Sequence, residues 1–184
     1  MADYYSQTVI QQPIPITDMT ALERLVLQEM FQSDVIDDTL YFSHDEGPRD
    51  LIWPMRSDVE AALKANPMRR PKNKDILIAL VENAMLKPPN DDGSVELDIS
   101  GISWERILQP IIERSTTLSY LTIVTSWTCS KMRPDGFGGM AIMVTATKIK
   151  CNSTAGILEK WIGAFEHAES TKSAKRKTKL RGAP

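Results

Sequence analysis

The densest group of reactive side chains and special backbone residues lies between Trp127 and Gly139. Cys129 stands where a strand should end, and Lys131 and Arg133 follow it closely. Nearby cations stabilise a thiolate and lower its pKa, and glycines let backbone amides turn toward an anion. The segment therefore predicts an anion-binding loop in which Cys129 is a weak candidate nucleophile and the anion-binding residues are Lys131, Arg133, Gly136, Gly138 and Gly139.

The same segment also fits a plain β-hairpin. A Pro-Asp-Gly turn followed by two further glycines is what a tight hairpin with a bulge uses, and a lone cysteine in a β-rich stretch is usually a small buried apolar residue. Three residues separate Cys129 from Arg133, whereas the loop of the cysteine phosphatases needs five. We favour the structural hairpin over the anion-binding loop, and the anion-binding loop over a catalytic cysteine.

A metal or cofactor site is not expected. His44, Asp45 and Glu46 could bind a divalent ion, but adjacent residues in an extended segment point to opposite sides. The only other imidazole, His167, is distant in sequence, and the two cysteines lack the paired spacing of a zinc site. Phosphate-binding, zinc-protease and nucleophile-elbow motifs are also missing. An enzymatic role is therefore less favoured than a binding role.

Charge is divided unevenly along the 184 residues. The formal net charge of −2 consists of +6 for residues 171–184, which contain no acid, and −8 for the rest. A segment with several basic side chains and no acidic ones attracts phosphates, because binding releases the counterions of the nucleic acid. The sequence therefore predicts a basic tail that contacts nucleic acid or an acidic partner through Lys172, Lys175, Arg176, Lys177, Lys179 and Arg181, and a solubilising tail is the alternative.

The helices and strands that position these residues can be predicted from the sequence pattern. Together they indicate an α+β fold, in which helices flank an antiparallel sheet. The capping-box pattern of Thr20 and Glu23 starts a helix that ends near Phe31. The second half of the chain reads β-α-β-β-α, with strands over 118–128 and 140–147 joined as a hairpin. A final helix begins at Ser153 or Thr154, and we expect its apolar stripe to face the core: Ile157, Leu158, Trp161, Ile162 and Phe165.

The expected organisation has three parts. Residues 1–16 lack periodicity and contain Pro13 and Pro15, which predicts a disordered lead-in. Residues 17–168 form a single α+β domain with a break at 87–93, and residues 169–184 form a disordered basic tail. No signal peptide or membrane span is recognised, and two cysteines are too few for a disulfide framework, so we expect a cytoplasmic protein with no membrane partner.

Three functions stay open at this level. The first is a non-enzymatic cytosolic binding or accessory protein that uses the basic tail, aided by the basic stretch Arg69, Arg70, Lys72 and Lys74. The second is a small enzyme or anion-binding domain that uses the Cys129 to Gly139 loop. The third is a homo-oligomeric module that pairs through the 140–147 strand edge or the Trp161 face, because the sequence leaves the oligomeric state open.

Overall fold

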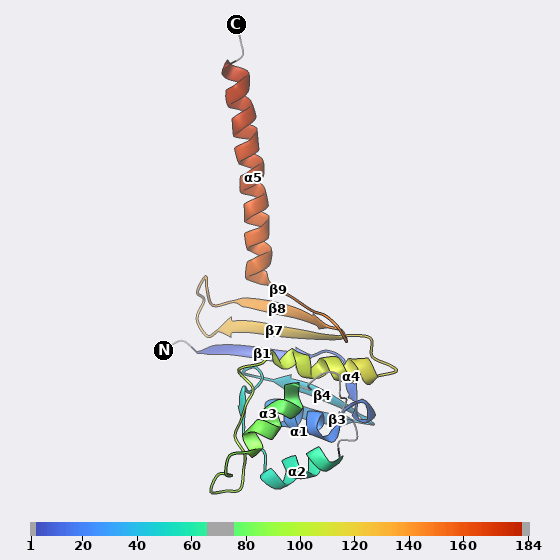
Figure 1. Ribbon diagram of the computed structural model, residues 1–184. Coiled ribbons are helices and arrows are strands. Elements are labelled where there is room, and N and C mark those ends of the chain that lie inside the picture. Colours follow the sequence, from blue (N-terminus) through green and yellow to red (C-terminus); the bar gives the residue numbers. More distant parts are fainter. Residues whose placement is uncertain (1–2, 66–75, 182–184) are drawn as a thin grey trace.

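The computed structural model describes the backbone of residues 3–65 and 76–181, and side chains within these ranges as far as Thr171. The expected α+β fold is confirmed: helices flank an antiparallel sheet (Figure 1). The elements in chain order are β1 (Tyr4–Ile10), β2 (Ile14–Pro15), η1 (Ile16–Asp18), α1 (Ala21–Met30), β3 (Gln32–Ile36), β4 (Thr39–His44), β5 (Leu51–Ile52), α2 (Arg56–Ala65), α3 (Ile76–Met85), β6 (Leu97–Asp98), η2 (Trp104–Ile107), α4 (Leu108–Arg114), β7 (Leu121–Cys129), β8 (Gly138–Val144), β9 (Ile149–Ser153) and α5 (Thr154–Arg181).

The main sheet has seven strands. Their order is β2-β4-β1-β7-β8-β9, and β3 also pairs with β4. The expected hairpin is present, with β7 and β8 paired antiparallel from Leu121 opposite Val144 to Trp127 opposite Gly138. β9, which the sequence did not reveal, pairs with β8 and ends the sheet. The second half therefore follows the expected order with this one strand added before the last helix.

Alternation of side chains along β7 gives the sheet one covered face and one open face. Leu121, Ile123 and Thr125 are buried, whereas Val124 between them is exposed. The covered face contributes to a core that also includes residues of α1 to α4 and of both halves of the chain. The break at 87–93 is a loop in which Gly93 has a φ of +83°, and β5 pairs with β6 across it.

Residues 1–16 were predicted to be a disordered lead-in, and for the described residues 3–16 that prediction is wrong. β1 lies inside the sheet between β4 and β7, in continuous register with β7 from Tyr4 opposite Cys129 to Ile10 opposite Ile123. Pro13 falls after the end of β1, so it marks where this strand stops. The strand escapes detection because its longer pairing, with β7, joins residues more than a hundred positions apart, and because only Thr8 and Ile10 near its end are buried.

Helix signals are more local and were predicted better. Thr20 and Glu23 form the expected capping box: the Thr20 N–H donates to Glu23 Oε2 at 2.7 Å, and the Glu23 N–H donates to Thr20 Oγ1 at 3.2 Å. Pro110 lies in the first turn of α4, where a missing N–H breaks no helical bond. The basic stretch from Arg69 to Lys74 lies outside the described residues. Among the described residues, no helix has the length and apolar character needed to cross a membrane.

Candidate interaction surface

Helix α5 extends away from the rest of the protein, beyond the β9 edge of the sheet (Figure 1). It begins at Thr154, the residue directly after β9, and two hydrogen bonds fasten this junction. The Gly139 N–H donates to Thr154 Oγ1 at 3.1 Å, and the Gly156 N–H donates to Ser153 Oγ at 3.0 Å. Because there is no linker between strand and helix, the direction of α5 is fixed by β8 and β9.

The apolar stripe of α5 is exposed, so the prediction that it faces the core is wrong. Trp161 is 65% exposed and Phe165 is 67% exposed, and Leu158 and Ile162 are more than half exposed. At 100° per residue these side chains fall within one face of the helix. Helical spacing shows that a set of apolar residues shares a face. It does not show what covers that face, and within the described residues this face is left uncovered.

The disordered tail predicted for residues 169–184 is also wrong over the described residues 169–181, because α5 continues as a helix to Arg181. Its composition explains the result, because Lys, Arg and Ala are good helix formers and the first glycine after Gly163 is Gly182. The six basic residues predicted to contact nucleic acid, from Lys172 to Arg181, all belong to this helix. The apolar residues and the basic residues of α5 thus occupy successive parts of one helix.

The Cys129 to Gly139 segment forms the hairpin connection between β7 and β8. Its chain reverses in a turn in which the Gly136 N–H donates to the Arg133 carbonyl at 3.1 Å. A Cβ on Gly136 would lie 2.8 Å from Cβ of Cys129, so this glycine is needed for close packing of the loop on the strand. The Gly139 amide is engaged by Thr154. Gly136 and Gly139 therefore serve packing and strand pairing, and neither has a positive φ.

The candidate nucleophile and the candidate cations of this loop differ in burial. Cys129 is buried, with 7% of its surface exposed, whereas Lys131 and Arg133 are exposed. Gly138 lies in β8, packed so that an added Cβ would be 3.0 Å from the indole of Trp127. This geometry is that of a structural hairpin whose cations are turned to solvent.

The His44 to Glu46 segment behaves as the adjacent-residue argument expects. His44 is buried and its Nδ1 accepts a hydrogen bond from the Glu46 N–H at 3.0 Å, whereas Asp45 is exposed. His44 Nε2 is buried and has no hydrogen-bond partner in the described structure. Within the described ranges, no group of three or more His, Cys, Asp or Glu side chains is placed to hold a metal ion.

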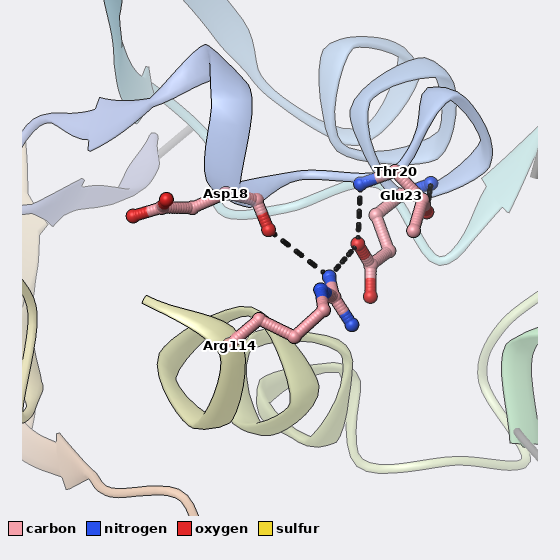
Figure 2. A network of polar contacts seen from close by, with 4 residues as sticks. All are labelled: Asp18, Thr20, Glu23 and Arg114. Carbon is pink, nitrogen blue, oxygen red and sulfur yellow. Dashed lines mark hydrogen bonds and ion pairs between the residues drawn. The ribbon is translucent and has the colours of Figure 1, made fainter. Parts of the chain in front are cut away.

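A buried polar network that the sequence did not reveal joins the two halves of the chain (Figure 2). Arg114, the last residue of α4, donates through Nη2 to Glu23 Oε2 and to the Asp18 carbonyl, the latter at 3.1 Å. Only 3% of the Glu23 side chain and 17% of the Arg114 side chain are exposed. The capping-box pattern predicted the Thr20 and Glu23 part of this network. The contact of Arg114 with Glu23 is seen only in the tertiary structure.

Burial governs the electrostatics of this network. Loss of solvation raises the pKa of Glu23, and the Thr20 N–H and the Arg114 guanidinium oppose that effect by stabilising the carboxylate. Asp18 Oδ2 and Glu23 Oε1 are buried without a hydrogen-bond partner in the described structure. The network connects η1, α1 and α4 through the Arg114 side chain. Because the Glu23 carboxylate is buried, loss of the Arg114 cation should destabilise the fold.

Comparison of the chain with models of known protein families, with curated proteins and with solved structures finds no match.

Proposed function

We propose that this protein is a non-enzymatic binding protein that contacts nucleic acid through the basic end of α5. The observation that carries the proposal is the division of charge between an acidic body of −8 and a helical, acid-free segment of +6. A helix that extends beyond the sheet edge separates these cations from the acidic body, which favours contact with an external polyanion. We also propose a cytoplasmic location, which suits two free cysteines.

The expected binding is independent of nucleic-acid sequence and depends strongly on salt. Each phosphate neutralised releases counterions, so six contacts to duplex DNA give a slope of log K against log salt of roughly −5. Residues 171–181 carry six Lys and Arg side chains and no Asn, Gln, Asp or Glu, and cations of this kind contact the phosphates of any sequence. We therefore expect similar affinities for DNA duplexes of unrelated sequence.

The test compares three chains by fluorescence anisotropy with labelled DNA and RNA between about 50 and 200 mM salt. They are the full chain, a chain ending at Ser170, and a full-length chain with all six Lys and Arg residues of 171–184 changed to glutamine. We expect binding by the full chain alone. Equal, negligible binding by all three would refute the proposal, and binding of polyglutamate but not of nucleic acid would replace it with the acidic-partner alternative.

The enzyme or anion-binding alternative rests on the Cys129 to Gly139 loop, and the geometry supports it less well. Its thiol is buried, and the cations that would hold a substrate are exposed. Alkylation of a Cys151→Ser chain reports Cys129 alone. We expect no labelling in the native state at neutral pH and full labelling in denaturant. Rapid native labelling that is suppressed by inorganic phosphate would favour the alternative.

A further inference from the structure

We propose that a second copy of this chain pairs antiparallel along the outer edge of β9 and covers the apolar half of α5. The inference uses surfaces separate from the basic end of α5, so it does not depend on nucleic-acid binding. It also corrects the expected pairing through residues 140–147. β8 lies between β7 and β9 and is paired on both sides, so its edge is not free.

β9 is the last strand of the sheet in the described part of the chain. It pairs with β8 on one side, and no strand among the described residues pairs with its other side. Its central residues Lys150, Cys151 and Asn152 are exposed. An edge strand presents backbone N–H and C=O groups in the arrangement that another strand needs for pairing.

Charge excludes some registers of such a pair and allows the one centred on Cys151. When two copies of β9 are related by a two-fold axis at Cys151, Lys150 lies opposite the partner's Asn152, and Ile149 lies opposite the partner's Ser153. Moving the axis to residue 150 would place two lysines directly opposite each other, which destabilises a pair. The register centred on Cys151 has no opposed like charges within β9.

The direction of α5 means that the second copy bound at β9 would also cover the apolar stripe of this helix. Its own sheet cannot serve, because the helix starts at the residue after β9 and runs outward from that edge (Figure 1). A sheet continued through β9 would lie on the side toward which α5 runs. At 1.5 Å per residue the stripe from residue 157 to 165 lies about 5 to 17 Å from the helix start. Strands about 4.8 Å apart place the partner's first three strands at that distance.

The area of the stripe suits a dimer. A large apolar side chain has a surface of about 150–250 Å², and the four main stripe residues are 52–67% exposed. Together they leave roughly 400–600 Å² uncovered on each copy, near the upper limit of apolar patches on monomers. A standard interface buries about 800 Å² per partner, and pairing along β9 supplies the remainder.

Oxidative cross-linking tests the register directly. Residues directly opposite in an antiparallel pair have Cα atoms about 4.5–5.5 Å apart, within the range that a disulfide spans. Treatment of the full chain with copper phenanthroline should therefore join Cys151 to the partner's Cys151. We expect a covalent dimer on a non-reducing gel, lost in Cys151→Ser and kept in Cys129→Ser, because Cys129 is buried.

A second cross-link keeps the test independent of the native thiol. In the Cys151→Ser background, a Lys150→Cys chain mixed with an Asn152→Cys chain should form the mixed dimer. Each of these chains alone should cross-link at least about tenfold less, because its own thiols lie diagonally apart. Equal cross-linking in all three samples would overturn the register and the proposal.

Light scattering tests the helix contribution. We expect twice the chain mass of 20.6 kDa for the full chain. Trp161→Ser with Phe165→Ser should weaken the dimer by tenfold or more, since exposed aromatic anchors dominate such interfaces. Lys160→Ser, on the opposite face of the helix, is the matched control and should leave the dimer unchanged. A monomer at tens of micromolar, or a monomer that sediments with anionic lipid vesicles through the stripe, would overturn the proposal.

Discussion

Replacing Arg114 by methionine should lower the free energy of unfolding by about 3 kcal/mol at neutral pH. Removing one member of a buried ion pair costs about 3–5 kcal/mol, because the other charge is left buried and uncompensated. The lower end applies because 17% of the Arg114 side chain is exposed. Methionine fills much of the same volume, so the cost comes from the lost charge and hydrogen bonds and from little else.

The pH dependence gives this prediction its sign. Burial raises the pKa of Glu23 above its ordinary value of 4.5, so the folded state holds the proton more tightly than the unfolded state. The contribution of Glu23 to the free energy of unfolding therefore falls as pH rises above 4.5, the pKa of Glu23 in the unfolded chain. Without Arg114 the raised pKa of Glu23 rises further, so the penalty of Arg114→Met should be small below pH 4.5 and grow toward pH 7.

Urea unfolding measures both effects. With a slope of about 2 kcal/mol/M, a loss of 3 kcal/mol moves the midpoint by about 1.5 M. Adding Glu23→Gln to Arg114→Met should restore more than half of the loss, because no charge then stays buried and unpaired. A midpoint change under about 0.5 M at neutral pH, or a loss of the same size at pH 4 and pH 7, would refute this account of the network.

Three further changes test the packing of the fold. Gly136→Ala should destabilise by about 1–3 kcal/mol in urea unfolding, because the new Cβ would overlap Cβ of Cys129; a neutral result would show that the loop is not held against the strand. Gly163→Ala, which adds a Cβ in open space within α5, should instead raise helix content by circular dichroism or stability by up to about 1 kcal/mol. Thr20→Ala should lower stability by about 1 kcal/mol through loss of the capping box, and an unchanged melting temperature would show that the cap is dispensable.

Prediction from sequence succeeded where the signal is local. The capping box at Thr20 and Glu23, the start of α5 at Thr154 and the β7–β8 hairpin all depend on residues within a few positions of one another. It failed for β1, whose partner β7 begins more than a hundred residues later. A strand with a polar first half has no periodic signal of its own, and its place is decided by the partner that binds it.

The candidate sites show the same division. The composition of the Cys129 to Gly139 loop indicated both a hairpin and an anion site. Only the structure showed that packing requires a glycine at position 136, where an added Cβ would lie 2.8 Å from Cβ of Cys129. The Arg114 tie was not foreseen, because nothing near Arg114 in sequence indicates that it reaches Glu23.

Sequence alone determined the fold class, the helical faces and the separation of acidic and basic charge, because these follow from residue type and short-range spacing. The tertiary structure alone decided which faces are covered. The stripe around Trp161 has the spacing of a core helix and yet lies exposed on α5, because the helix starts directly after the edge strand β9 and runs away from its own sheet. Periodicity specifies that a face is apolar, and chain geometry specifies which surface can reach it.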